Sequence, residues 1–105
     1  MRGQSALTRF PIKKSKKKME EPMRLLVVED ERSLREDIAK KLRLSGYEVD
    51  ACEDGEEALE ILASEQYDLI LLDLNLPKVD GMTVLRTLRE SDLETRVLIL
   101  SARSE

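Results

Sequence analysis

The sequence is most informative between residues 67 and 77, which read Tyr67-Asp68-Leu69-Ile70-Leu71-Leu72-Asp73-Leu74-Asn75-Leu76-Pro77. Four apolar residues, Leu69 to Leu72, run without interruption into the carboxylate of Asp73, and a turn containing Asn75 and Pro77 follows. A short apolar run bounded by turn residues is typical of a strand buried on both faces, as in parallel sheets. Because proline cannot donate to a strand ladder, the strand must end before Pro77. Asp73 is therefore predicted at the carboxyl end of a central strand, the edge where open α/β sheets bind ligands.

Taken alone, Asp73 also has a simpler interpretation. A carboxylate at the end of a buried strand is costly unless something compensates it, and an aspartate in this place often caps a turn. A second acidic group favours the functional interpretation. Residues 24–28 form another buried-strand run, Arg-Leu-Leu-Val-Val, and it too ends in acids, namely Glu29, Asp30 and Glu31.

Helical and strand patterns alternate along the rest of the chain. Residues 48–52 alternate polar and apolar side chains, which predicts a strand near the sheet edge, and Val97–Leu100 predicts a last strand. Glycines at positions 46, 55 and 81 mark the end of the first helix and the starts of two others. The side chains expected to face the core are Leu34, Ile38 and Leu42 in the first helix, Ala58, Leu59 and Leu62 in the second, and Met82, Leu85 and Leu88 in the third.

Strands that alternate with helices of this length imply a parallel sheet with right-handed crossovers. The chain has 105 residues, which suffices for one small domain, and its 41% apolar content in periodic runs indicates a folded one. The single cysteine, Cys52, excludes an intramolecular disulfide, and the absence of histidine excludes histidine-based triads and metal sites. We expect no membrane span and no secretory signal, and hence a cytoplasmic location.

The net charge of −4 divides unevenly along the chain. Residues 1–22 carry seven basic and two acidic side chains, a net +5, which leaves −9 on residues 23–105. The run from Lys13 to Lys18 is suited to contacts with nucleic acid or anionic lipid. Blocks of like charge are more often simply disordered, so we expect residues 1–22 to be a disordered basic extension of a domain at 23–105.

The two acidic strand ends converge if their strands are neighbours. Adjacent strands lie about 4.8 Å apart, so Glu29, Asp30 and Asp73 would share one pocket. Like charges so close repel, and the usual remedy is a hard divalent cation such as Mg²⁺. A carboxylate beside such a cation is suited to attack phosphorus, and the hydroxyl of Ser101 follows the next strand at the same edge. Each residue taken alone also has an ordinary structural explanation. Glu29 or Asp30 could simply be solvated after a strand, Ser101 could cap a helix, and Lys78 is expected to be an ordinary exposed loop lysine.

Together these motifs resemble the receiver domain of two-component response regulators. The resemblance covers residues 23–103 and is carried by Leu25–Glu31, Leu71–Pro77, Asp80-Gly81 and Leu100–Arg103. It is greatest to the branch that carries a C-terminal winged-helix DNA-binding domain. It implies a flavodoxin-like, doubly wound parallel sheet of strand order 2-1-3-4-5, with the first and third strands side by side.

The resemblance also implies the role of each site residue. Asp73 would be the phosphoacceptor, taking phosphate from the histidine of a sensor kinase. Glu29 and Asp30 would hold Mg²⁺ together with Asp73, and the backbone carbonyl of Asn75 would complete the set of metal ligands. Ser101 would be the switch hydroxyl that closes on the phosphoryl group.

Measured against this family, we expect the chain to be C-terminally truncated. The last strand, the last two helices, a lysine that pairs with the phosphate and the DNA-binding domain have no counterpart in the sequence. Residues 97–100 would then form an exposed apolar edge through which copies of the chain could associate.

Three other functions compete with a phosphorelay module that is not itself an enzyme. The first is a non-signalling fragment or dominant-negative partner, which binds a kinase or a full-length regulator without switching. The second is a phosphatase with an aspartyl nucleophile, which would require an acid at position 75, where this chain has Asn75. The third is nucleic-acid binding through the basic segment, which would depend strongly on salt.

Overall fold

The computed structural model describes residues 21–100, so the expectations for residues 1–20 and for Ser101 lie outside the described part. The elements, in chain order, are β1 (Arg24–Val28), α1 (Arg32–Leu44), β2 (Glu48–Cys52), α2 (Gly55–Leu62), β3 (Leu69–Leu72), α3 (Gly81–Ser91) and β4 (Arg96–Ile99). The four strands are parallel and lie in the order β2-β1-β3-β4. This is the flavodoxin-like arrangement that the sequence predicted, as far as β4.

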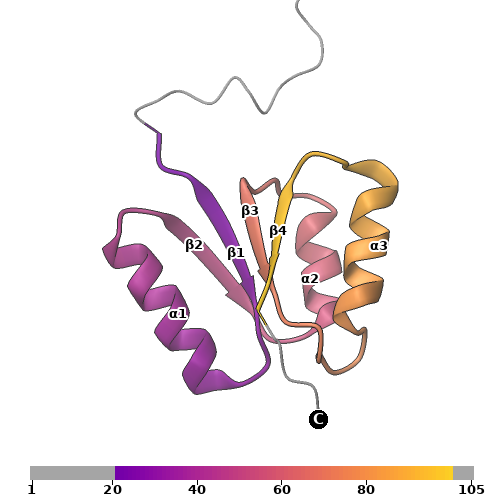
Figure 1. The fold of residues 1–105 in the computed structure, drawn as a ribbon, viewed down its shortest axis with the longest axis horizontal. Coiled ribbons are helices and arrows are strands. Elements are labelled where there is room, and N and C mark those ends of the chain that lie inside the picture. Colours follow the sequence, from indigo (N-terminus) through magenta and orange to yellow (C-terminus); the bar gives the residue numbers. More distant parts are fainter. Residues whose placement is uncertain (1–20, 101–105) are drawn as a thin grey trace, which may run out of the picture.

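The helices cover both faces of the sheet, with α1 on one face and α2 and α3 together on the other (Figure 1). Alternate residues of the central strands β1 and β3 supply both cores. In β1, Leu26 and Val28 pack toward α2 and α3, whereas Leu25 and Val27 pack toward α1. The central strands β1 and β3 are therefore apolar at successive positions, because both of their faces are buried.

Capping residues and glycines set the ends of the helices. Asp54 and Asp80 cap α2 and α3, each accepting a hydrogen bond from the backbone N–H three residues on, at 2.7 and 2.8 Å. Gly46, with φ of 100°, provides the left-handed turn that follows α1.

Two of the predicted core residues are wrong, and β4 begins and ends one residue before the predicted strand. Leu34 and Met82 are each 43% exposed. In their place, Ala39 of α1 and Val84 of α3 are buried, at 3% and 1% exposure. A four-residue apolar spacing identifies a stripe on a helix, but it does not fix which side of that stripe meets the sheet.

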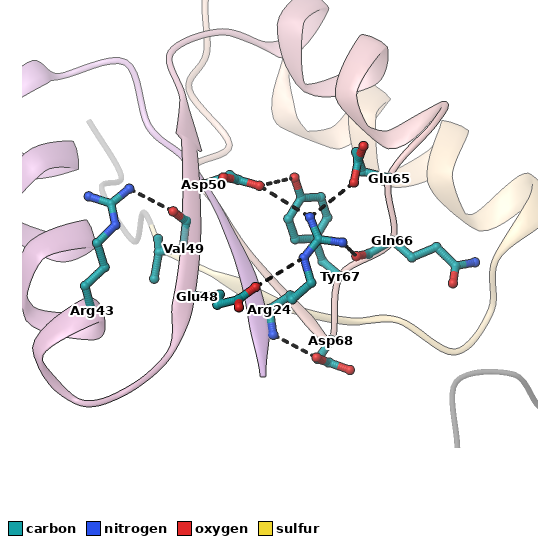
Figure 2. A network of polar contacts seen from close by, with 9 residues as sticks. All are labelled: Arg24, Arg43, Glu48, Val49, Asp50, Glu65, Gln66, Tyr67 and Asp68. Carbon is teal, nitrogen blue, oxygen red and sulfur yellow. Dashed lines mark hydrogen bonds and ion pairs between the residues drawn. The ribbon is translucent and has the colours of Figure 1, made fainter. Parts of the chain in front are cut away.

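At the amino ends of the strands, one arginine gathers polar groups from β2 and from the segment before β3 (Figure 2). The Arg24 guanidinium donates to the Glu65 carboxylate at 3.2 Å and the Gln66 carbonyl at 2.9 Å, and it lies 3.5 Å from the Asp50 carboxylate. It also lies 4.7 Å from the centroid of the Tyr67 ring, whose hydroxyl donates to Asp50 at 2.7 Å. We call these five residues the amino-edge network.

Cys52 is buried, and burial raises the pKa of its thiol to about 12. The thiol is thus neutral at physiological pH and unsuited to act as a nucleophile. None of the helices in the described part of the chain has the length and apolar character needed to cross a bilayer.

Candidate functional site

Three carboxylates meet at the opposite end of the sheet, and we call them the carboxyl-edge cluster: Glu29, Asp30 and Asp73. One carboxylate oxygen from each lies within 4.8 Å of those of the other two. Glu29 and Asp73 are buried, at 3% and 1% exposure, and Asp30 is exposed. The convergence that the sequence predicted is therefore present in the structure.

The sheet itself brings these acids together. Val28 of β1 is in register with Leu72 of β3, and each is followed directly by one of the buried acids. The backbone N–H of Asp73 donates to the Val28 carbonyl at 3.0 Å, and that of Glu29 donates to the Cys52 carbonyl at 3.1 Å. Both acids thus continue the strand ladders, which hold their backbones in place.

Hydrogen bonds satisfy only part of this cluster. Asp73 Oδ1 accepts from the backbone N–H of Asn75, and Glu29 Oε2 accepts from that of Glu31, both at 3.0 Å. Asp73 Oδ2 is buried and has no hydrogen-bond partner among the described residues. Burying a carboxylate oxygen without a hydrogen-bond partner costs free energy, which indicates that this oxygen is available to bind a ligand.

The electrostatics of the cluster agree with this interpretation. Burial raises the pKa of the Glu29 carboxyl, and the nearby carboxylates of Asp73 and Asp30 raise it further. The hydrogen bond from the Glu31 N–H acts in the opposite direction and offsets part of this rise. The cluster therefore concentrates negative charge in a site with little access to water.

The β3–α3 loop, residues 73–80, is held against this cluster by close packing at two glycines. A Cβ on Gly81 would lie 2.5 Å from the Asp73 carbonyl oxygen, and one on Gly55 would lie 1.7 Å from the Val79 carbonyl oxygen. Lys78, predicted to be an ordinary exposed lysine, is 61% exposed, but its Nζ lies 3.6 Å from Asp54 Oδ2. The loop is thus fixed to the first turns of both α2 and α3.

Among the residues predicted for the site, Asn75 lies next to Asp73 in the structure. The sequence did not reveal a further neighbour of the site, Arg35. Asn75 lies beside Asp73, to which it donates its backbone N–H, while Ser101 lies outside the described residues. Arg35 of α1 is not among the residues that the sequence predicted for the site. Its guanidinium donates to the Glu29 carbonyl at 3.0 Å, a contact that nothing in a single sequence reveals.

Two other features are less suited to be the site. Glu53, Asp54 and Glu57 also group within 4.8 Å of one another, but the buried member, Asp54, already caps α2 and pairs with Lys78. A cavity of about 450 Å³ lies at the other end of the sheet and includes none of the carboxyl-edge cluster. It is lined by Leu62, Glu65, Gln66, Tyr67, Leu88, Ser91, Asp92, Leu93, Glu94 and Thr95.

The donors of the carboxyl-edge cluster fit a hard divalent cation. Mg²⁺ prefers oxygen ligands, is commonly held by one or two carboxylates, and keeps room for water and phosphate oxygens. The cluster offers three carboxylates, one of them with an unpartnered oxygen. Glu29, Asp30 and Asp73 are therefore the residues that could hold such an ion.

Comparisons with known proteins agree with this geometry. The family model of the response regulator receiver domain matches residues 25–105. The transcriptional regulatory protein DltR of Streptococcus agalactiae is 49% identical over 83 residues. That match takes in 79% of this chain and 37% of DltR, so the chain spans little more than a third of the relative's length.

Two solved structures extend the comparison to three dimensions. The response regulator TrrA in complex with the histidine kinase ThkA is 38% identical, with a TM-score of 0.72, over 79% of this chain and 72% of that one. TrrA of Thermotoga maritima in complex with Mg²⁺ and BeF is 32% identical, with a TM-score of 0.64, over 77% of this chain and 89% of that one.

Proposed function

The chain belongs to the response regulator receiver domain family, and from this we propose that Asp73 accepts a phosphoryl group from a sensor histidine kinase. The observation that carries the proposal is the state of Asp73. It is 1% exposed, and its Oδ2 has no hydrogen-bond partner among the described residues. A carboxylate oxygen held still and unpartnered is prepared to attack phosphorus.

We assign Glu29, Asp30 and Asp73, with the backbone carbonyl of Asn75, to a Mg²⁺ site. When bound, Mg²⁺ would neutralise charge on the phosphoryl oxygens and on the acids themselves. TrrA, a relative of similar fold, was solved with Mg²⁺ and BeF, which supports this assignment.

The transfer itself requires little of the protein beyond position and charge. An Asp73 oxygen forms a bond to phosphorus as the phosphorus–nitrogen bond to the kinase histidine breaks. The bonding electrons pass to the imidazole nitrogen, and the ring takes up one proton from solvent, so that the kinase histidine leaves as neutral imidazole. The N–H of Asn75 holds Asp73 Oδ1 at 3.0 Å, which leaves Oδ2 as the attacking atom.

The kinase is proposed as the partner because TrrA, a relative in the same family, was solved in complex with the kinase ThkA. We further propose that Ser101 hydrogen-bonds the phosphoryl group and that phosphorylation controls a transcriptional output, as the name of DltR indicates for that protein. The chain would act in the cytoplasm as a signalling module rather than as an enzyme, because phosphate uptake changes Asp73 itself.

The test is intact mass after incubation of the chain with a small-molecule phosphodonor, with and without Mg²⁺. We expect a single phosphate adduct that requires Mg²⁺ and disappears in Asp73→Asn. Asp68→Asn is the matched control, because it changes an aspartate at the other end of β3 and should leave the adduct intact. A folded chain that takes up no phosphate would contradict the proposal.

A second candidate is a non-signalling binding partner that associates through β4. Within residues 21–100, β4 pairs with β3 on one side and forms an edge of the sheet on the other, with Leu98 and Ile99 at 52% and 40% exposure. An apolar edge strand is a template for pairing with another chain. Self-association measured by analytical ultracentrifugation, weakened in Leu98→Lys, would support association of copies of the chain through β4, and a monomer at all concentrations would exclude that association.

A further inference from the structure

Arg35 reaches from α1 back over the junction between β1 and α1. Its Nη1 donates to the Glu29 carbonyl oxygen at 3.0 Å and to the Asp30 carbonyl oxygen at 3.4 Å. Its side chain is 15% exposed, whereas that of Arg32, three residues earlier on the same helix, is 81% exposed and pairs with Glu36. Arg35 is therefore engaged with the junction rather than with solvent.

The two carbonyl groups that Arg35 contacts belong to the peptide units on either side of Asp30. Holding both units restricts the backbone angles of Asp30 and thus the direction of its carboxylate. Asp30 has particular need of this support, because it is the exposed member of the carboxyl-edge cluster. Glu29 and Asp73, in contrast, are held by the strand ladders and by hydrogen bonds to their side chains.

Among the described residues, the start of α1 has one other side-chain support, the hydrogen bond that the Glu31 N–H donates to Glu29 Oε2. Glu31, at the N-cap, makes no side-chain capping hydrogen bond, whereas Asp54 and Asp80 cap the other two helices. The other terminal nitrogen of Arg35, Nη2, lies 4.0 Å from the Glu53 carboxylate, which is not part of the carboxyl-edge cluster. The hydrogen bonds of Arg35 go to carbonyl oxygens, so the carboxylate oxygens stay available to a cation.

We propose that Arg35 is a positioning residue for the metal site, which raises Mg²⁺ affinity by orienting Asp30 without touching the ion or the phosphoryl group. This inference rests on the proposed Mg²⁺ site. Groups that orient metal ligands typically change metal affinity by a factor of about 10 to 100 when removed. The effect is expected at the lower end here, because Arg35 orients only one of the three carboxylates of the site.

The experiment measures Mg²⁺ affinity of the chain by calorimetry, without any phosphodonor. Arg35→Ala is expected to bind Mg²⁺ about 10-fold more weakly. Arg35→Lys should recover part of the loss, because an ammonium group can donate to one carbonyl but lacks the planar fork of arginine. Arg32→Ala, the matched control, should stay within about twofold of wild type, because its ion pair is exposed.

A double-mutant cycle with Asp30→Ala separates positioning from general stability. If Arg35 acts through Asp30, Arg35→Ala should weaken Mg²⁺ binding in the wild type but add almost nothing in the Asp30→Ala background. Equal affinities of wild type and Arg35→Ala, or equal losses in the two backgrounds, would overturn the inference while leaving the proposed function intact. A wild-type chain that binds no Mg²⁺ would overturn both.

Circular dichroism and urea unfolding in EDTA establish that each variant is folded before its affinity is measured. If Arg35→Ala does not fold, Arg35→Lys carries the test, with a Mg²⁺ affinity below that of wild type expected. An Arg35→Lys variant that is folded and binds Mg²⁺ as wild type does would then overturn the inference.

Discussion

Acids cluster at both ends of the sheet, but only at one end does the protein itself supply a cation to pair with them. At the amino ends of the strands, the carboxylates of Asp50 and Glu65 surround Arg24, whose guanidinium lies within 3.5 Å of both. At the carboxyl ends, Glu29, Asp30 and Asp73 face one another, and Asp73 Oδ2 has no hydrogen-bond partner among the described residues. Figure 2 shows the first of these arrangements, with the guanidinium at its centre.

The difference separates a structural use of charge from a functional one. The amino-edge network carries its own cation, so its charges are satisfied whenever the chain is folded. The carboxylates of the carboxyl-edge cluster repel one another, and a bound cation would relieve this repulsion. Without a cation, the backbone around the cluster must hold the carboxylates together.

The first prediction concerns packing at the carboxyl edge. Gly81→Ala is expected to destabilise the fold by about 3 kcal/mol, because its Cβ would lie 2.5 Å from the Asp73 carbonyl oxygen and 2.6 Å from Leu74 Cα. Urea unfolding measures this loss. Gly46→Asn is the control, because nothing lies within 4 Å of its Cβ position. Its φ of 100° strains any side chain, but without a clash the loss should be smaller than for Gly81→Ala. If both variants were equally stable, close packing at Gly81 would not contribute to the stability of this edge of the sheet.

The second prediction concerns the cation of the amino edge. Arg24→Ala should cost about 2 kcal/mol, because the network loses its cation and the hydrogen bonds that Arg24 donates, and the Tyr67 ring loses the guanidinium that lies over it. Arg43→Ala removes a single hydrogen bond, to the Val49 carbonyl at 2.7 Å (Figure 2), and should cost about half as much. A smaller loss for Arg24→Ala than for Arg43→Ala would contradict the network's role.

The third prediction makes the same chemical change at both ends. In EDTA, Asp73→Asn should stabilise the fold by about 1 kcal/mol, since it removes a charge from three that repel. Asp50→Asn should destabilise the fold, since it weakens the interaction with Arg24. Adding Mg²⁺ should stabilise the wild type more than Asp73→Asn. Changes of the same sign at both ends would refute the contrast.

The fourth prediction concerns pH. Because folding raises the pKa of Glu29, the folded state holds this proton more tightly than the unfolded state does. The resulting stability is present below the unfolded value of 4.5 and is lost as pH rises through the folded value. In EDTA, unfolding curves measured across this range should show the wild type losing stability relative to Glu29→Gln. Parallel pH profiles would indicate that burial and the neighbouring carboxylates do not raise the pKa of Glu29 on folding.

Much of the fold could be predicted because burial on two faces leaves a clear pattern in the sequence. The central strands read as continuous apolar runs, and the turn residues after them placed Asp73 correctly. The spacing of acids after two such runs also predicted their convergence, since parallel strands end at a common edge. The functional roles of these residues remain predictions that the experiments above test.

The remaining features depend on how each helix is rotated about its axis and on which residues, distant in the sequence, become neighbours. A single sequence shows neither. Leu34 and Val84 show this for the helices, because the helical period does not specify which part of an apolar stripe meets the sheet. Arg24 and Arg35 show it for charges, because a basic residue beside a strand or on a helix is ordinarily solvated. Their partners, Glu65 and the Glu29 carbonyl, become neighbours only when the chain is folded.

The ultraviolet absorbance of Tyr67, which changes when its hydroxyl ionises, can report on the state of the amino-edge network. The chain has no tryptophan and only two tyrosines, so Tyr47→Phe would leave Tyr67 as its single phenol. Burial and the hydrogen bond to Asp50 raise the pKa of Tyr67, so its ultraviolet absorbance should resist alkaline titration for as long as this edge stays closed. A rapid jump to high pH would then record, as a change in absorbance, how often the edge opens in the native protein.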